Sequence, residues 1–286
     1  MTDTVTLPCP AKVNLLLRVL AREDDGYHGI ETLFCRISLA DELVMERRDG
    51  RGVTIEVEGG DTGPDEENLA VRAAKMVLDA TGNRAALHIR LTKRIPVRAG
   101  LGGGSSNAAS ALAAAGQLTG HAIPRAELLQ FASRLGADVP FFLSGASLAL
   151  AWGHGERLMR LPPLPKAPAL VVVPPNGIGT AEAYRWVDEA REGVGRRGSV
   201  VLDGEALGSW GDVARMAGND FESPVFGRHP EIRGAFEALA VTHPLLCRMT
   251  GSGSALFTVY RSPSEREDAR MMLGRKWGKV LEVETG

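Results

Sequence analysis

The stretch Pro96-Val-Arg-Ala-Gly-Leu-Gly-Gly-Gly-Ser-Ser-Asn107 decides how the first half of this chain folds. Four of its residues are glycines, and residues 108–115, which follow directly, contain six alanines. Glycine disfavours helix and alanine has the highest helix propensity, so a loop is expected to give way to a helix near Ser105 or Ser106. We expect one of these serines to cap the helix by accepting a hydrogen bond from a backbone N–H.

This stretch, called the phosphate loop below, has the composition of an anion-binding site. The first amides of a helix have no partner within the helix, and glycine lets an anion approach them closely. A flexible linker is also rich in glycine, but hydrophobic, regularly patterned segments flank this run on both sides. Two nucleotide signatures do not fit, because no lysine follows the glycines and Ser105 stands where a dinucleotide fingerprint ends in glycine or alanine.

The composition is that of an ordinary globular protein. The 286 residues include 33 basic and 35 acidic side chains, for a net charge of −2, and 44% are hydrophobic. This balance disfavours partners such as nucleic acid or a membrane surface. Cys9, Cys35 and Cys247 are odd in number and widely spaced, so we expect reduced thiols without a metal-ligand role. With no signal-peptide pattern and no apolar run of transmembrane length, a cytoplasmic location is expected.

Hydrophobic patterns predict the elements of the first half. Strands are expected at 5–7, 12–20, 30–39, 42–47, 53–58 and 86–91, with Pro8 and Pro10 around the break between the first two. A helix is expected from about Asn68 to Thr81, with Gly82 ending it. The alanine-rich helix should end at Gly120, and a further helix should occupy 124–135.

The second half is expected to begin at Pro162-Pro-Leu-Pro165, the best linker signal in the chain. We therefore expect two domains, 1–161 and 162–286. A hairpin at 147–161 precedes this boundary, and beyond it strands are expected at 169–173 and 279–283, with a strand–turn–strand unit at 247–260. Helices are expected at 180–191, around 203–216, at 228–240 and at 265–277, and residues 193–199 should form a loop. This mixture predicts the α+β class.

Polar residues on the first strands leave two interpretations open. Lys12 and Asn14 lie on one face of their strand, where the lysine is either solvated or presents a cation beside an amide to a ligand. The turn at 24–29 carries Tyr27 and His28, and it is either an exposed tip or a recognition loop.

Two later features are equally open on local grounds. Asp138 follows a helix end and is either a turn residue or a functional carboxylate. The turn Gly251-Ser-Gly253 is either a plain hairpin or a backbone contact for a ligand. A hydrolase that used Ser105 or Ser106 as its nucleophile lacks any motif for a partner base.

Three motifs occur in an order that points to a known family. They are Pro10-Ala-Lys-Val-Asn14, the glycine run within 96–106, and Gly251-Ser-Gly253. Together they resemble the GHMP kinases, which phosphorylate small-molecule alcohols with ATP. Further marks at 25–28, 31–34, 136–140 and 219–222 resemble the branch of this superfamily that acts on a methylerythritol linked to cytidine diphosphate. The resemblance implies a ribosomal-protein-S5-like N-terminal domain, a ferredoxin-like C-terminal domain and an active site in the cleft between them.

The resemblance also implies roles in catalysis and ATP binding. Asp138 would be the general base for the C2 hydroxyl of the substrate, and Lys12 would keep that carboxylate ionised and stabilise charge on the reacting oxygen. Mg²⁺ would accompany ATP, and the sequence indicates no protein ligand for it. The residues matching ATP-binding positions are Asn68, Lys93, Pro96, Val97, Arg98, Ala99, Gly100, Leu101, Gly102, Gly103, Gly104, Ser105, Ser106 and Asn107.

One residue of the phosphate loop departs from the family pattern. Arg98 stands where such loops often carry glycine. Either the loop backbone differs at this position, or the arginine side chain reaches a phosphate oxygen.

On the substrate side, the resemblance implies a site for the cytosine ring. Tyr27 and Tyr184 would sandwich the base while His28 hydrogen-bonds its polar edge. The full set of matching positions is Asn14, Tyr27, His28, Thr180, Tyr184, Gly251, Ser252 and Gly253. The protein is expected to act as a monomer or weak homodimer.

Two alternative functions share these motifs. Another GHMP kinase, for homoserine, mevalonate or a sugar, would have no use for an aromatic turn that stacks on a base. A non-catalytic nucleotide-binding regulator would tolerate the loss of Lys12 or Asp138, and both are present. The sequence therefore favours the kinase for the cytidyl-linked alcohol.

Overall fold

Two compact units make up the protein, each built from several chain segments. The computed structural model describes residues 3–24, 26–82, 85–120, 123–191, 204–205, 207–274 and 276–286. Asp25 and the expected loop at 193–199 lie outside these residues. Unit 1 comprises Met1–Ala11, Leu39–Val97 and Gly102–Ala146, and unit 2 comprises Lys12–Ser38, Arg98–Leu101 and Ser147–Gly286. Each unit joins segments that are far apart in the sequence, whereas the expected domains 1–161 and 162–286 are continuous. The boundary between residues 161 and 162 therefore stays a prediction.

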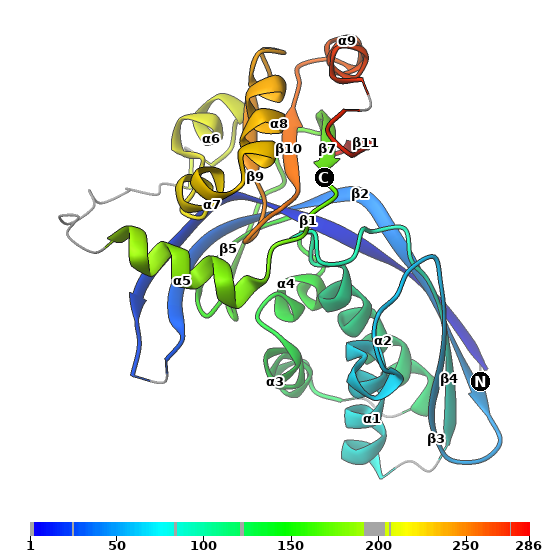
Figure 1. Cartoon of the computed structure of the whole chain (residues 1–286). Coiled ribbons are helices and arrows are strands. Elements are labelled where there is room, and N and C mark those ends of the chain that lie inside the picture. The colour runs from blue at the N-terminus through cyan, green and yellow to red at the C-terminus, as the bar shows by residue number, and fades with distance from the viewer. Residues whose placement is uncertain are drawn as a thin grey trace. The chain divides into compact units, whose positions relative to one another are not determined.

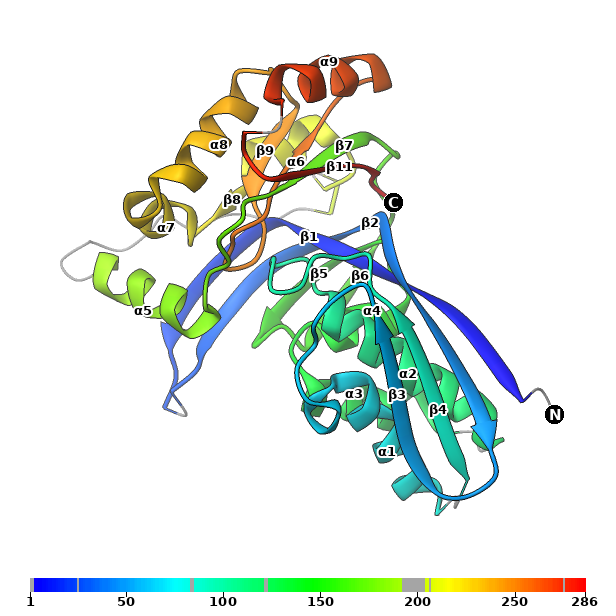
Figure 2. The same cartoon turned by 45° about the vertical axis from the view of Figure 1, so that its right-hand side comes forward.

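Unit 1 is a sheet with helices on one face (Figure 1, Figure 2). Strand β4 (Ala86–Thr92) pairs in parallel with β3 (Gly52–Glu58) and antiparallel with the second part of β2 (His28–Arg48). The first part of β1 (Thr4–Arg22) completes the sheet beside β2. The 3₁₀ turn η1 and the helices are Asp65–Glu67, α1 (Leu69–Thr81), α2 (Gly103–Thr119), α3 (Arg125–Leu135) and α4 (Val139–Ser144).

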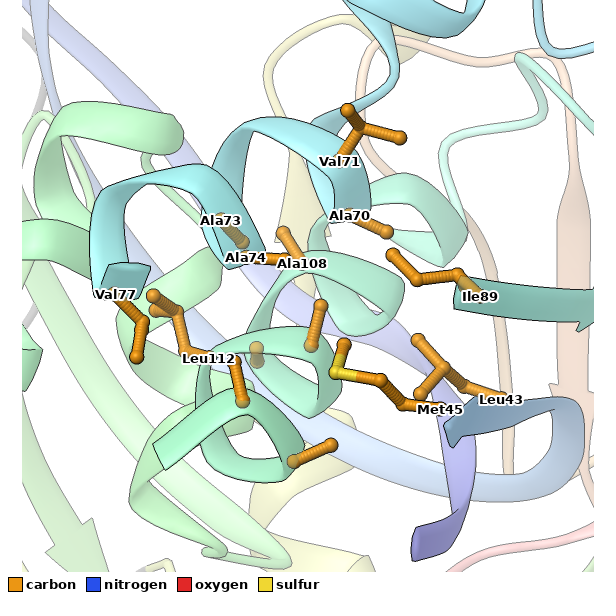
Figure 3. Close-up of a cluster of buried hydrophobic side chains, with 14 of the residues drawn as sticks. Leu43, Met45, Ala70, Val71, Ala73, Ala74, Val77, Ile89, Ala108 and Leu112 are labelled. Carbon is orange, nitrogen blue, oxygen red and sulfur yellow. The ribbon is translucent and has the colours of Figure 1, made fainter. Parts of the chain in front are cut away.

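The core of unit 1 joins the two alanine-containing helices to the sheet (Figure 3). Helices α1 and α2 contribute small buried side chains, among them Ala70, Ala73, Ala74 and Ala108, and the strands contribute Leu43, Met45 and Ile89. Small side chains allow helix axes to approach closely. This packing fixes the position of α2 and therefore of the phosphate loop that leads into it.

Unit 2 contains the remaining parts of β1 and β2 and a second sheet (Figure 2). The hairpin of β5 (Leu148–Gly153) and β6 (Arg157–Leu161) pairs antiparallel with the first part of β2. The second sheet is antiparallel, in the order β11–β7–β10–β9, with β7 at Pro168–Val173, β9 at Leu246–Met249, β10 at Leu256–Val259 and β11 at Lys279–Glu284.

Five described helices and one short strand complete unit 2. The helices are α5 (Thr180–Arg191), α6 (Trp210–Met216), α7 (Glu222–Arg228), α8 (Pro230–Ala240) and α9 (Pro263–Leu273). The two-residue strand β8 (Gly218–Asn219) pairs in parallel with β1 at Leu16 and Leu17. Apolar side chains of α8 and α9 pack with those of β7 and β10 into one core. No helix within the described residues combines the length and apolar character needed to cross a membrane.

Most expected elements are confirmed, but the first two strands are longer than expected. Strand β1 continues through Pro8 and Pro10, and β2 continues through Asp41, where a break was expected. In its first part β1 is an edge strand, since β8 joins its other side at Leu16 and Leu17, and edge strands tolerate proline. Asp41 is tolerated within β2 because its buried carboxylate accepts hydrogen bonds from Lys93, Asn107 and two backbone N–H groups.

Helices α6, α7 and α9 of unit 2 also differ from expectation. Helix α6 begins at Trp210 because Ser209 caps it, accepting a hydrogen bond from the Asp212 N–H. Helix α7 was not expected. Helix α9 ends at Leu273 rather than near 277, because Gly274 takes a positive φ of 59°.

Candidate functional site

The phosphate loop enters α2 at Gly103, two or three residues before the junction expected at Ser105 or Ser106. The N-cap is Gly102, with φ of 72°, and no side chain caps the helix, so the expectation of a serine cap was wrong. In the first helical hydrogen bond, Ser106 N donates to Gly102 O at a distance of 2.9 Å. A Cβ on Gly103 would lie 3.1 Å from Ile95 Cγ2, so glycine allows the helix to start against this neighbour. Close packing here overrides the low helix propensity of glycine.

The start of α2 has the features of an anion-binding end. The amides of Gly103, Gly104 and Ser105 precede the first helical hydrogen bond, so they are available to a ligand. A Cβ on Gly104 would find its nearest neighbour, Leu69, 3.9 Å away, which leaves room at this position. The helix dipole favours negative charge at the same end. This geometry agrees with the expected binding of phosphate.

A buried polar network in unit 1 supports this helix start. The Asp41 carboxylate accepts from the Lys93 ammonium, from Asn107 Nδ2 at 2.9 Å, and from the backbone N–H groups of Arg94 and Ile95 at 2.7 and 2.8 Å. Lys93 also donates to Asn107 Oδ1 at 3.0 Å. The structure thus brings together two expected ATP residues, through an aspartate that the sequence reading missed. A direct contact of either with ATP stays a prediction.

Asn68 has a clear role at the start of α1. Its side chain caps the helix by accepting from Ala70 N at 3.0 Å, and its Nδ2 donates to Thr62 Oγ1 at 3.2 Å. The expected helix with Asn68 and Gly82 at its ends is therefore confirmed. A contact between Asn68 and the adenine of ATP stays a prediction.

In unit 2, residues 98–101 of the phosphate loop contact the other two family motifs. Leu101 O accepts from Lys12 N at 3.0 Å, and Ala99 O accepts from Ala255 N at 3.3 Å. Gly100 has φ of 79°, and a Cβ there would lie 2.4 Å from Thr250 O. Only glycine fits so close to another backbone. Motifs that lie about 90 and 150 residues apart therefore meet in space.

Arg98 takes a backbone conformation that favours glycine. Its φ is 58°, in the left-handed region, and its side chain is exposed. This explains why a glycine suits the position in related loops. We expect Arg98→Gly to raise the free energy of unfolding by about 0.5–1 kcal/mol, since relief of roughly 1–2 kcal/mol of left-handed strain outweighs the chain entropy of glycine.

Urea unfolding checks this prediction, with Arg98→Ala as the matched control. Alanine keeps the Cβ that causes the strain, so this variant should show no such gain. Equal stability of the glycine and alanine variants would contradict the assignment of strain to Arg98.

Asn14 is the centre of a second buried network, in unit 2. Its Oδ1 accepts from Lys12 Nζ at 2.7 Å, Thr250 Oγ1 at 3.0 Å and Gly251 N at 2.9 Å, and its Nδ2 donates to Thr32 Oγ1 at 2.8 Å. Lys12 Nζ also lies 5.2 Å from the centre of the Phe34 ring. These contacts hold the Lys12 ammonium and the turn at 251–253 in fixed positions. A contact of Asn14 with substrate stays a prediction.

The motif at 219–222 supports the same turn. Asn219 Nδ2 donates to Met249 O at 2.8 Å and to Gly251 O at 2.9 Å. Glu222 Oε1 accepts from Met249 N at 2.9 Å, and burial raises the pKa of the Glu222 carboxyl. From the sequence this motif is a family mark alone, and the structure gives it a positioning role.

The raised pKa of Glu222 predicts a pH-dependent contribution to stability. The folded protein binds the Glu222 proton more tightly than the unfolded chain, whose carboxyl has a pKa near the ordinary 4.5. The contribution is therefore fully present below pH 4.5 and is lost as pH rises through the higher folded pKa. We expect Glu222→Gln, measured by urea unfolding from pH 4 to 8, to gain stability relative to the parent as pH rises. A stability difference that does not change with pH would contradict this.

The aromatic residues of the expected substrate side gather in unit 2. The His28 ring stacks on Tyr184, with centroids 5.1 Å apart and planes at 20°, and Tyr184 packs edge-on against buried Phe221. His28 Nε2 lies 2.7 Å from Asp188 Oδ1. Tyr27 is 67% exposed. The structure therefore brings His28 and Tyr184 together, and it adds Asp188, which the sequence reading missed.

Two further expected residues meet at the start of α5. The Thr180 and Ser252 hydroxyl oxygens lie 3.3 Å apart. Thr180, Tyr184 and Asp188 are spaced by four residues on this helix, so they share one face. This spacing is the signal by which the sequence could have indicated Asp188.

Asp138 lies at the N-terminus of α4 in unit 1, and Lys12 lies in unit 2. Asp138 occupies the N-cap position but its side chain makes no capping hydrogen bond. Its pairing with Lys12 in catalysis stays a prediction.

Comparison with known proteins assigns the chain to a family. Sequence profiles described as "GHMP kinases N terminal domain" and "GHMP kinases C terminal" match residues 68–146 and 205–279. A 4-diphosphocytidyl-2-C-methyl-D-erythritol kinase from Pelotomaculum thermopropionicum is 38% identical over 95% of this chain and 93% of its own length. One from Solibacter usitatus is 40% identical over 92% of this chain and 84% of its own length.

Solved structures give the same result for the fold. A crystal structure of 4-(cytidine 5'-diphospho)-2C-methyl-D-erythritol kinase matches with a TM-score of 0.82 and 39% identity, over 99% of both chains. A homoserine kinase from Cytophaga hutchinsonii matches with a TM-score of 0.72 over 100% of this chain and 95% of its own, but its identity of 18% indicates a shared fold alone. The expected α+β, two-domain GHMP kinase fold is confirmed.

Proposed function

Because the chain belongs to the 4-diphosphocytidyl-2-C-methyl-D-erythritol kinases of the GHMP superfamily, we propose that it transfers the γ-phosphoryl group of ATP to the C2 hydroxyl of that alcohol. The products are the 2-phosphate and ADP, in the non-mevalonate pathway to isoprenoid precursors. The observation that carries this proposal is the 38–40% identity, over more than nine tenths of this chain, to kinases of that name. The shared fold alone would fit a homoserine kinase equally well.

Asp138 and Lys12 are proposed to carry out the proton transfer. A hydroxyl group is a poor nucleophile, and Asp138 would accept its proton as the oxygen attacks phosphorus. Lys12 would stabilise negative charge on the reacting oxygen. The fixed position of its ammonium, bonded to Asn14 and close to Phe34, supports this role because a preorganised charge needs no rearrangement during the reaction.

The phosphate loop is proposed to bind the phosphates of ATP. The amides of Gly103, Gly104 and Ser105, at the positive end of α2, are suited to oxygen atoms of the β- and γ-phosphates. The network of Asp41, Lys93 and Asn107 would support the loop from behind. Phosphoryl transfer depends mostly on such positioning and on neutralising charge.

Mg²⁺ is proposed to be carried largely by the phosphates. In the part of the chain that the structure describes, no group of three or more His, Cys, Asp or Glu side chains is placed to hold a metal ion. Mg²⁺ commonly keeps several waters and binds substrate phosphates with one or two carboxylates, so such a site is compatible with these residues. When bound, the ion would neutralise charge on the phosphates, and we assign it no protein ligand.

The cytosine ring is proposed to stack on Tyr27 and Tyr184 while His28 hydrogen-bonds its edge. Tyr27 exposes 67% of its surface and lies 5.5 Å from the His154 ring, centre to centre, and Tyr184 and His28 are held by their neighbours. Thr180, Ser252 and the backbone of 251–253 would contact the rest of the substrate. We further propose, from the sequence, the domain division 1–161 and 162–286, a monomer or weak homodimer, and a cytoplasmic location.

Replacing Tyr27 with alanine should weaken substrate binding without affecting stability. Stacking on a base contributes about 1–3 kcal/mol, so we expect KM for the cytidyl-linked alcohol to rise roughly 10- to 100-fold at saturating ATP, with kcat little changed. Because Tyr27 is 67% exposed, Tm should not move. Tyr27→Phe, which keeps the ring, is the control and should retain a near-normal KM. An unchanged KM in the alanine variant would argue against the stacking role.

Analysis of the product tests the proposed reaction. The enzyme is incubated with Mg²⁺, ATP and the cytidyl-linked alcohol, and the product is identified by ³¹P NMR and mass spectrometry. We expect one new phosphomonoester, on C2, formed in equal amount to ADP. ADP release without a phosphorylated alcohol, or a phosphate on another hydroxyl, would contradict the proposal.

A further inference from the structure

His28 is held rigidly by two partners on α5. Its Nε2 lies 2.7 Å from Asp188 Oδ1, and its ring stacks on Tyr184. Tyr184 in turn packs against Phe221, with the two ring planes perpendicular and the ring centres 5.0 Å apart. The His28 side chain is only 7% exposed. The orientation of the imidazole is therefore set by this face of α5.

The contact with Asp188 also selects the tautomer of the neutral His28 ring. A carboxylate accepts hydrogen bonds and does not donate them, so the proton resides on Nε2. The proton on one ring nitrogen leaves the other with a lone pair. Among the described residues, Asp188 is the one hydrogen-bond partner found for this ring. Nδ1 is thus left as an acceptor for a ligand.

We infer that Asp188 is a positioning residue that makes His28 select cytosine over uracil. Cytosine presents an amino donor at N4, whereas uracil presents an oxygen acceptor at the equivalent position. An acceptor at Nδ1 complements the amino group and faces the uracil oxygen with a second lone pair. This inference rests on the proposed function, because it requires the base of the substrate to lie at His28.

The opposite tautomer would reverse the preference, which makes Asp188→Asn the informative variant. An asparagine can turn its Nδ2 donor toward Nε2, and the ring then carries its proton on Nδ1. That proton would face the amino group of cytosine and would suit the oxygen of uracil. Asparagine has nearly the same shape as aspartate, so the packing of α5 is kept.

The experiment measures kcat/KM for cytidyl-linked and uridyl-linked methylerythritol at saturating ATP. We expect Asp188→Asn to lower the preference for the cytidyl substrate roughly 10- to 100-fold, mainly through KM. Glu189→Gln is the matched control, since it removes the same charge from the next residue, which pairs with Arg185 and Arg228 instead. This control should keep the parental preference.

The ¹⁵N NMR signals of the His28 ring supply a second readout that does not depend on turnover. The parent should show a proton on Nε2, and Asp188→Asn should show it on Nδ1. A parent ring that carries a proton on Nδ1, alone or together with one on Nε2, would overturn this inference and leave the proposed function standing. An equal loss of kcat/KM for both substrates in the variant would do the same. A parent enzyme that does not phosphorylate the cytidyl-linked alcohol would overturn the proposed function and, with it, the inference.

Discussion

Asp138→Asn is expected to lower kcat roughly 10²–10⁴-fold, the range that general-base catalysis supplies. The amide cannot accept the proton of the C2 hydroxyl, so the alcohol must attack phosphorus without assistance. Affinity for ATP should remain close to that of the parent, because Asp138 is proposed to act on the hydroxyl of the alcohol and not on the nucleotide. Single-turnover kinetics with saturating substrates measures the chemical step directly.

Asp79→Asn is the matched control for this variant. Asp79 is an exposed residue of α1 in the same unit, so the substitution makes the same chemical change away from the proposed site. The control should retain parental turnover. Near-normal kcat in Asp138→Asn would remove Asp138 from the mechanism.

Asp41→Ala is expected to lower the free energy of unfolding by about 3–5 kcal/mol, because it leaves the Lys93 ammonium buried without its counter-charge. The side chains of Asp41 and Lys93 are 0% and 4% exposed, so solvent screens the unpaired ammonium poorly. The variant also removes the acceptor for Asn107 and for the backbone of Arg94 and Ile95. Urea unfolding measures the loss.

A double-mutant cycle separates the unpaired charge from the loss of packing. Asp41→Leu with Lys93→Met replaces the pair by apolar side chains, and removing both charges should restore much of the stability lost in either single variant. If the Asp41 and Lys93 variants that still fold also have a higher KM for ATP, the network supports the phosphate loop as proposed. A loss of less than about 1 kcal/mol in the free energy of unfolding of each single variant would show that the Lys93 ammonium does not need Asp41 as its counter-charge.

The sequence predicted those parts of the fold that rest on local signals. Asn68 and Gly82 bound α1 because a capping side chain and a left-handed glycine act within a few residues of the helix ends. The start of α2 was placed too late because helix propensity alone decided it. In the folded protein, Gly103 packs closely against Ile95, and this contact is invisible to propensity.

The parts of the candidate site that sequence reasoning missed depend on partners far apart in the chain. Asn14 and Thr250 are separated by 236 residues, and Asp41 and Asn107 by 66. No local pattern can reveal that the Asn14 side-chain oxygen accepts from Thr250 and Gly251, or that an aspartate within a strand is paired with a lysine. Asp188 is different, since its spacing of four residues from Tyr184 was visible in the sequence. Arg98 was noticed, but its positive φ required the structure.

The most direct test of the assigned activity compares ADP release from Mg²⁺-ATP with three alcohols. These are 4-diphosphocytidyl-2-C-methyl-D-erythritol, methylerythritol 4-phosphate, which lacks the nucleotide, and mevalonate. We predict turnover with the first alone, because Tyr27, His28 and Tyr184 are proposed to bind a cytosine ring, which the other two alcohols lack. Turnover with methylerythritol 4-phosphate or mevalonate, and none with the cytidyl-linked alcohol, would contradict the proposed substrate while keeping the kinase fold.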